Sequence, residues 1–263
     1  MSRGREAGSF RRDARNTGGQ GGATPADPLF SLFPTGIRAN WRSDSGVTLG
    51  AGVASWTDRY AGRVLLQATG TKQPAFNLFQ INARPTLTFD GTSDELVSNE
   101  AASAWRFLSD GTGCTVFCVL IPRTDPYGTY LATNSESGST PGIWLRCQGG
   151  AHRCEVYNTT SILSLNSATT PNDVPVIVDF SYKEVSAPEG VNRTVNTQRT
   201  TGNSTGAPTA GDPNHTLILG AIRSGGFYSR VDIAELIVFN RELSAAEKST
   251  VYTSYLQPLY GSI

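Results

Sequence analysis

The clearest pattern of apolar and polar positions in the chain covers residues 231–247. From Val231 to Phe239 both the odd and the even positions are mostly apolar, as in a strand that is covered on both faces. We therefore predict a strand in the middle of a sheet. Ser244 and Glu247 then form a capping box, because the hydroxyl accepts a backbone N–H that the first helical turn leaves unpaired and the carboxylate reaches back to the cap. A helix is expected to begin there.

The expected helix is short and amphipathic. Its apolar face consists of Val251, Tyr252, Tyr255 and Leu256. Pro258 lacks a backbone donor and disfavours a helical conformation at the preceding residue. We therefore predict that the helix ends near Leu256.

The rest of the chain is predicted to form short strands joined by turns. Apolar runs of strand length alternate with turn residues, and no helical period is sustained before Ser244. The best-defined expected strands cover residues 114–121, 142–148, 154–158 and 174–182. With 28 Gly and 14 Pro among 263 residues, the composition is that of a mainly β protein.

Two connecting segments have turn or loop signatures. Asp90-Gly91 is typical of a hairpin turn, because Leu87 and Phe89 alternate before it and Leu96 follows. Thr197–Asp212 is rich in Thr, Gly, Asn, Pro and Ala. We expect it to be a surface loop of the kind that carries binding groups.

The N-terminal segment differs from the rest of the chain. Residues 1–27 have no periodicity, contain a Gly-rich run and are too poor in apolar residues to fold alone, so we predict an extended arm at 1–27 and one domain at 28–263. Five arginines against Glu6 and Asp13 give residues 1–22 a charge of +3, although the whole chain is neutral. The residues of the arm that we expect to contact a partner are Arg3, Arg5, Phe10, Arg11, Arg12 and Arg15.

Arginines in such an arm contact either phosphates or an acidic protein surface. They are not interleaved with aromatic residues and the chain is neutral overall, so we favour docking to a protein over binding to nucleic acid. No apolar run reaches the roughly 18 residues of a membrane span, and the N-terminus has no apolar signal region. We expect synthesis in a cytosol and no membrane insertion.

Four cysteines occur in the chain, at Cys114, Cys118, Cys147 and Cys154. They are too few for a disulfide framework in a chain of this length, and neither spacing is the C-x-x-C motif of zinc sites. We predict buried free thiols. A Cys147–Cys154 bridge across a hairpin, and a metal site, are the alternatives.

Seven short segments follow one another in an order that is specific as a set, although each is weak alone. They are Trp41–Val47, Ser55–Asp58, Gln73-Pro74, Arg84–Gly91, Phe117–Ile121, Ile218–Gly220 and Ile233–Glu247. This order resembles the laminin G-like and concanavalin A-like lectin/glucanase superfamily, in the form often seen in phage and bacterial surface proteins, and covers about residues 37–261. The resemblance implies two antiparallel sheets packed as a jelly-roll sandwich, with the strand at 231–239 inside.

The strand at 231–239 is the first candidate for catalytic residues. A β-glucan-cleaving member of the superfamily would carry the pattern E-x-D-x-x-E with two catalytic carboxylates. Asp232 and Glu235 supply D-x-x-E, but Arg230 stands where the first carboxylate is required. We therefore predict a structural role for Glu235 and no catalytic residue. His152 and His215 are expected in surface turns, without the partners of a catalytic triad.

No cofactor is expected, and the only metal candidates are weak. Asp90, Asp94 and Glu95 are clustered oxygen ligands beside a turn, but their spacing lacks a recognisable calcium pattern.

Among the four tryptophans, Trp41 and Trp56 match core positions of the superfamily. Trp105 lies between expected strands and is the candidate contact for a glycan or a partner, because an indole offers an apolar face with a polar edge. Core packing is the favoured alternative for Trp105.

These features led us to expect a non-enzymatic structural protein of a virus particle, most naturally a phage capsid decoration or head-fibre protein. The arm would bind a virion protein such as the major capsid protein, and the chain would be a homo-oligomer, for example a trimer, located in the virion after synthesis in the host cytoplasm. The alternative is a carbohydrate-binding adhesin that recognises a host surface glycan through Trp105 and the loop at 197–212. A glycan hydrolase is the third hypothesis.

Overall fold

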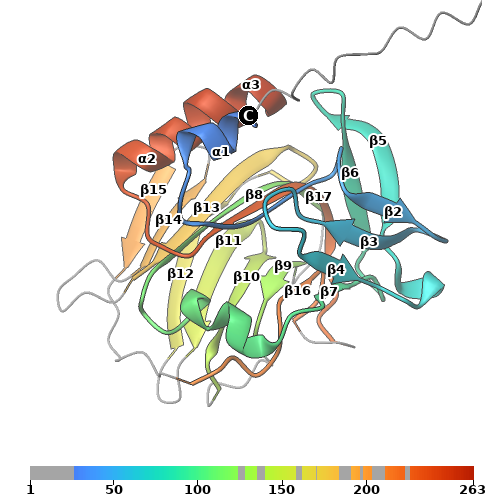
Figure 1. Cartoon of the computed structure of the whole chain (residues 1–263), viewed down its shortest axis with the longest axis horizontal. Helices are drawn as coiled ribbons and strands as arrows, with labels where there is room; N and C mark the ends of the chain where they lie inside the picture. Colours follow the sequence, from blue (N-terminus) through green and yellow to red (C-terminus); the bar gives the residue numbers. More distant parts are fainter. Residues whose placement is uncertain are drawn as a thin grey trace, which may run out of the picture.

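In the computed structural model the chain folds into two antiparallel β-sheets that pack face to face, with helices on the outer side of one sheet (Figure 1). The structure describes residues 27–123, 128–134, 140–157, 162–169, 171–183, 191–195, 198–202, 211–222 and 226–263. This architecture confirms the predicted fold class, a mainly β, two-sheet antiparallel sandwich with a short C-terminal helix. The predicted arm lies outside the described residues, apart from Asp27.

The first sheet, sheet A, is built around β17 (Arg230–Phe239), the strand that the apolar pattern predicted in the middle of a sheet. β17 pairs with β8 along one side, and with β6 and then β1 along the other. In spatial order the sheet contains β15 (Gln198–Gly202), β14 (Val191–Val195), β13 (Val176–Tyr182), β8 (Cys114–Pro122), β17, β6 (Arg84–Asp90) and β5 (Ala75–Ile81), with β1 (Ile37–Arg42) beside β17.

The second sheet, sheet B, has nine strands within the described residues, one more than sheet A. The two sheets face each other across an apolar core. In spatial order it contains β12 (Ile162–Thr169), β11 (Ala151–Tyr157), β10 (Gly142–Gln148), β9 (Gly128–Ala132), β16 (Ile218–Leu219), β7 (Leu96–Ser98), β4 (Val64–Leu66), β3 (Val53–Thr57) and β2 (Val47–Leu49). The described part of the chain also contains α1 (Pro28–Leu32), η1 (Gly70–Lys72) and η2 (Ala102–Leu108) before the C-terminal helices.

Two large apolar cores hold these layers together, and a smaller apolar cluster includes Trp144 and Tyr157. The main core fills the space between the sheets and includes Trp41 and Trp56, both fully buried, which confirms the prediction for these two residues.

A second core lies between the outer face of sheet A and the helices (Figure 1). There Phe117 packs edge to face against Tyr252 of the C-terminal segment, and Phe239 packs edge to face against Phe33. Burial of large aromatic side chains on both faces explains why β17 and β8 are apolar at nearly every position.

The C-terminal helix begins as predicted and ends later than predicted. The capping box between Ser244 and Glu247 is present at the start of α2 (Ala245–Thr250). The chain then continues through the π-helix η3 (Val251–Leu256) and α3 (Gln257–Tyr260). Pro258 does not stop the helix, because it lies in the first turn of α3, where a backbone N–H has no acceptor within that segment.

Two connections also differ from their predictions. The turn at Asp90-Gly91 does not close a hairpin, because the strand before it belongs to sheet A and β7 after it belongs to sheet B. The expected loop at 197–212 contains strand β15, which pairs with β14 at the end of sheet A. Most of the remainder of that segment lies outside the described residues.

The cysteines are buried free thiols, as predicted. Cys147 and Cys154 are not opposite each other, because the tight β10–β11 hairpin places Cys147 opposite His152. His152 is therefore in a strand and buried, and the prediction of a surface turn was wrong for this residue. Among the described residues, no helix has the length and apolar character needed to cross a bilayer.

Candidate functional site

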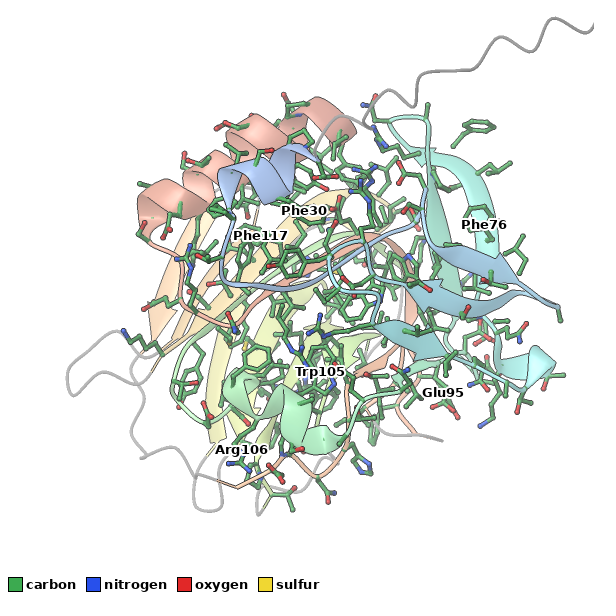
Figure 2. All side chains as sticks on the ribbon, viewed as in Figure 1. Phe30, Phe76, Glu95, Trp105, Arg106 and Phe117 are labelled. Carbon is green, nitrogen blue, oxygen red and sulfur yellow. The ribbon has the colours of Figure 1, made fainter. Side chains whose placement is uncertain are left out.

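Trp105, the sequence candidate for a glycan contact, is fully buried in the main core. Its ring lies 6.1 Å from that of Trp41, and the Arg38 guanidinium lies 5.1 Å from its centroid. Figure 2 shows where Trp105 lies in the molecule. A surface ligand does not reach an indole that is enclosed in this way. The placement agrees with the core-packing alternative for Trp105.

Two of the three weak metal candidates bind parts of their own turn, and the third pairs with a lysine on η1. Asp90 accepts backbone N–H groups from Thr92 and Ser93 at 2.7 and 2.9 Å, and Asp94 accepts the backbone N–H of Asp90 at 3.0 Å. Glu95 is buried and faces the Lys72 ammonium at 3.3 Å. Within the described ranges, no group of three or more His, Cys, Asp or Glu side chains is arranged to hold a metal ion.

Glu235, the remaining carboxylate of the glucanase-like pattern, has a structural environment. It is fully buried on β17 and accepts hydrogen bonds from Asn40, Tyr255 and Tyr260 at 2.6, 2.7 and 2.8 Å. Burial raises the pKa of Glu235 despite these donors. The environment is that of a structural residue, as predicted, and the partners are side chains from β1 and the C-terminal helix.

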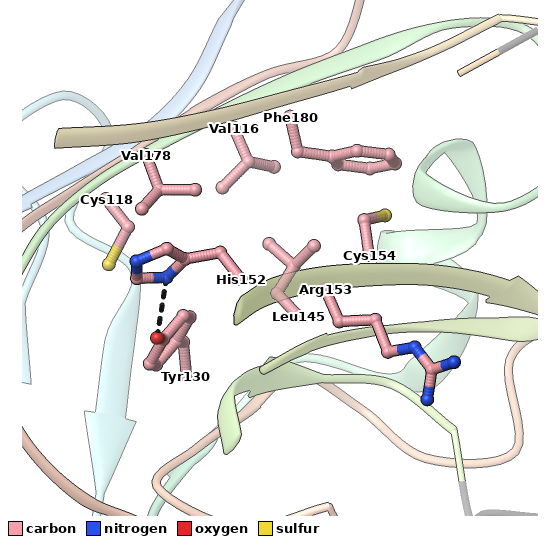
Figure 3. A pocket seen from close by; sticks show the side chains of 9 residues that line it. All are labelled: Val116, Cys118, Tyr130, Leu145, His152, Arg153, Cys154, Val178 and Phe180. Carbon is pink, nitrogen blue, oxygen red and sulfur yellow. Dashed lines mark hydrogen bonds between the residues drawn. The ribbon is translucent and has the colours of Figure 1, made fainter. Parts of the chain in front are cut away.

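A small cavity lies between the sheets around His152 and Tyr130 (Figure 3). Nδ1 of His152 and the phenolic oxygen of Tyr130 are 2.8 Å apart, and the remaining walls are formed by apolar residues, two cysteines and Arg153. The cavity has a volume of about 10 Å³, which is room for one water molecule. It is too small to admit a sugar.

The exposed site with binding chemistry is the tip of the hairpin formed by β5 and β6. Phe79 is 72% exposed and Leu78 56% exposed, the first being the most exposed large apolar side chain among the described residues. Phe79 also has a φ of +61°, a conformation that bulky L-residues rarely adopt. Strained residues of this kind persist where the surrounding structure holds them, and they cluster at functional sites.

The chain around Phe79 leaves the regular ladder of sheet A. β5 is the edge strand, and its pairing with β6 is interrupted between Asn77 and Ile81, so the three residues in between form a bulge. Edge strands of this type are a common place for bulges, which re-aim side chains toward solvent. The bulge turns Leu78 and Phe79 outward.

The tip is nevertheless firmly anchored to the rest of the molecule. Ile81 is buried in the second core, and the side chains of Asn82 and Arg84 both donate to the carbonyl oxygen of Leu259 at 3.0 Å. Phe76 lies on the same strand and packs against the main core (Figure 2). The aromatic ring of Phe79 is thus presented from a rigid support.

The surroundings of the ring are polar. Gln80 and Asn82 are exposed neighbours whose amide groups both donate and accept hydrogen bonds. An exposed aromatic face beside amide groups suits a sugar, which has an apolar ring face and hydroxyl groups at its edge. The sequence offered one signal for this site, the adjacent apolar pair Leu78-Phe79, which the sequence analysis missed.

Comparisons with known proteins place the fold. No family model and no curated protein sequence matches the chain. Solved structures of Trypanosoma rangeli sialidase do match: the complex with sialic acid has 18% sequence identity over 87% of this chain with a TM-score of 0.59, and the complex with 2,3-difluorosialic acid has 18% identity over 91% with a TM-score of 0.60. The chain spans 34% and 36% of the length of those two sialidase chains. At this identity the likeness establishes a shared β-sandwich.

These matches contradict the expected function. We had predicted a non-enzymatic structural protein of a virus particle, such as a phage decoration or head-fibre protein, whereas the solved structures compared above are those of a sialidase, which is a glycan hydrolase. That hypothesis is withdrawn. Arg3 and the other five residues of the arm that we expect to contact a partner lie outside the described part of the chain. The partner predicted for the arm therefore stays untested.

Sialidases use a tyrosine as their nucleophile, and the pair of Tyr255 and Glu235 has the residue types for such chemistry. Both side chains are buried, however, and burial raises the pKa of each. A nucleophilic phenolate requires access to the substrate and a lowered pKa. We therefore assign Tyr255 and Glu235 a structural role, in which their hydrogen bond joins the C-terminal helix to sheet A.

Proposed function

We propose that the chain is a glycan-binding β-sandwich of the concanavalin A-like lectin type and that it contacts sugars through the hairpin tip of β5 and β6. The observation that carries this proposal is the exposed, strained Phe79 ring, held rigidly beside Gln80 and Asn82. The ordered sequence segments of the superfamily support the same assignment. So does the sandwich shared with a sialidase that binds sialic acid.

The sandwich is proposed to act as a recognition unit in glycan processing. It matches about a third of each sialidase chain, so a unit of this kind occurs there within a larger protein. Stacking of an aromatic ring on a pyranose buries apolar area, while the amide groups orient the hydroxyls. This combination gives weak binding to a single sugar and stronger binding when several copies engage together.

A glycan array tests this proposal. The wild-type chain is expected to bind a subset of glycans, and Phe79→Ala to weaken that binding about tenfold or more, which corresponds to roughly 1.4 kcal/mol. Leu49→Ala is the matched control, because Leu49 is a similarly exposed apolar residue (58%) on β2 of the other sheet. Equal binding by the wild type and Phe79→Ala would rule out this tip as the glycan site.

The wild-type chain and Phe79→Ala also test hydrolysis. Each is incubated with the glycans that the wild type binds on the array, and the released sugar is measured over time. Release that Phe79→Ala reduces would join binding and cleavage in this chain. Release that is unaffected by Phe79→Ala would place the cleaving site elsewhere and leave the tip without a role in it.

A further inference from the structure

A lysine and an aspartate are in contact where the C-terminal helix packs on sheet A. Lys248 is on α2 and Asp179 is on β13. Nζ of Lys248 lies 3.1 Å from Oδ1 of Asp179, and the two side chains are 10% and 0% exposed. The pair is therefore enclosed by protein, unlike an ion pair at the surface.

The surroundings of this pair are mostly apolar. Asp179 is the cross-strand partner of Phe117, and the second core around them also contains Ile177, Val251 and Tyr252. Removing an ammonium and a carboxylate from water has a free-energy cost for each ion. If one proton passes from the ammonium to the carboxylate, the ion pair becomes a neutral amine beside a neutral acid. Burial favours this neutral pair.

Two hydroxyl groups orient the reacting side chains. Nζ of Lys248 donates to Oγ of Ser181 at 2.6 Å, and the hydroxyl of Tyr252 donates to Oδ2 of Asp179 at 2.9 Å. Oδ1 of Asp179 has no hydrogen-bond partner among the described residues, although Nζ is close to it. The nitrogen therefore approaches the carboxyl group without the alignment of an N–H···O bond.

We propose that Lys248 and Asp179 condense into an amide bond between their side chains, which cross-links α2 to β13. The lone pair of the neutral amine attacks Cγ of the protonated acid, and the C–N bond forms. One proton moves from Nζ to the leaving Oδ1 hydroxyl, the C–Oδ1 bond breaks, and one water molecule is released. Tyr252 donates to Oδ2, where negative charge develops during the attack.

The fold supplies what this reaction needs. An amine that is desolvated in an apolar site is a nucleophile, and holding it against the acid makes the condensation intramolecular. The balance requires no oxidant, metal or second substrate. The bond would hold one end of the C-terminal helical segment on sheet A, while the hydrogen bonds of Tyr255 and Tyr260 to Glu235 hold the other end.

Mass spectrometry of the denatured full chain tests this proposal. The wild type is expected to be lighter than its sequence mass by one water molecule, and a tryptic digest is expected to join the peptides that contain Asp179 and Lys248. Lys248→Met and Asp179→Ala are expected to have their full sequence mass. Tyr252→Phe keeps both reacting groups and is expected to form the bond about tenfold more slowly, which a time course of the mass after cell-free synthesis measures.

The pair of Lys72 and Glu95 is the matched control. Its nitrogen and oxygen are 3.3 Å apart, but the Lys72 side chain is 35% exposed, so water reaches the ammonium. The peptides that contain Lys72 and Glu95 are expected to stay separate. Lys72→Met is expected to lose one water molecule as the wild type does.

Three outcomes would overturn the proposal. The first is a wild-type chain with its full sequence mass, a result that does not depend on whether any variant folds. The second is loss of water while the peptides of Asp179 and Lys248 stay separate, as when another aspartate cyclises. The third is a cross-link between Lys72 and Glu95 as well, because proximity alone would then explain the bond without burial.

Discussion

The phenol of Tyr255 donates a hydrogen bond over 2.7 Å to one oxygen of the buried carboxylate of Glu235. Tyr260 donates to the other oxygen of the same carboxylate over 2.8 Å. Residues five positions apart in an α-helix point in directions that differ by roughly 140°. Tyr255 itself lies in the π-helix η3, where each residue turns the chain by less than in an α-helix, and Tyr260 lies in α3.

Tyr260→Phe tests how much this contact stabilises the fold. Loss of one donor to a buried carboxylate is expected to lower the free energy of unfolding by about 1.5–3 kcal/mol. Urea unfolding followed by circular dichroism measures the change. Tyr60→Phe is the control, because Tyr60 is 40% exposed, and it is expected to change the free energy by less than about 0.5 kcal/mol. Equal losses in the two variants would contradict the assigned role of Tyr260.

The helix at this position shows where sequence reasoning succeeds and where it fails. The capping box and the apolar face were predictable because they depend on residues three to five positions apart. The end of the helix was not, because the rule for Pro258 assumes one uninterrupted α-helix. The segment instead ends at Gly261, a C-cap glycine with a φ of +82°.

The candidate sites follow the same division. Burial of Trp105 depends on Trp41 and Arg38, which are more than sixty positions away, and no local pattern reports such contacts. The exposure of Phe79 depends on a break in the pairing of β5 with β6. The four buried thiols and the structural role of Glu235 were predictable because general rules on free cysteines and on a missing catalytic carboxylate suffice.

Asp94 is expected to make stability depend on pH. Burial and the charge of Asp90 raise the pKa of Asp94 from 3.8 to about 6. Between about pH 4 and pH 6 the folded state binds more protons at this group than the unfolded state does, so its contribution to stability is present at low pH and is lost as pH rises through 6. Ionisation of Asp94 therefore destabilises the fold at neutral pH.

Asp94→Asn is expected to remove this effect and keep an acceptor for the backbone N–H of Asp90. Relative to the wild type, the variant should be more stable by on the order of 1 kcal/mol at pH 8 and nearly unchanged at pH 4. Chemical denaturation at a series of pH values measures the difference. A difference that is constant across the series would show that Asp94 acts through something other than its ionisation.

Phe79 is expected to serve binding rather than stability. Phe79→Gly removes an exposed ring and relieves a positive φ, while the gain in flexibility of the unfolded chain acts in the opposite direction. The free energy of unfolding is therefore expected to stay within about 0.5 kcal/mol of the wild type. Phe76→Gly, on the same strand but packed against the main core, should lose about 2 kcal/mol or more. A large loss in Phe79→Gly would instead assign a structural role to the tip.

Gly220 follows β16 and has the strongest steric requirement for glycine in the main core. Its φ is +79°, and an added Cβ would lie 2.2 Å from the nearest ring atom of Phe89, which is fully buried. Because Phe89 has no free volume into which it can move, Gly220→Ala is expected to destabilise the fold by roughly 3 kcal/mol or more. Gly62→Ala separates packing from backbone strain, since Gly62 has a similar φ of +71° with no atom within 4 Å. It should lose only about 1 kcal/mol, and equal losses in the two variants, measured by thermal unfolding, would show that backbone strain outweighs the contact with Phe89.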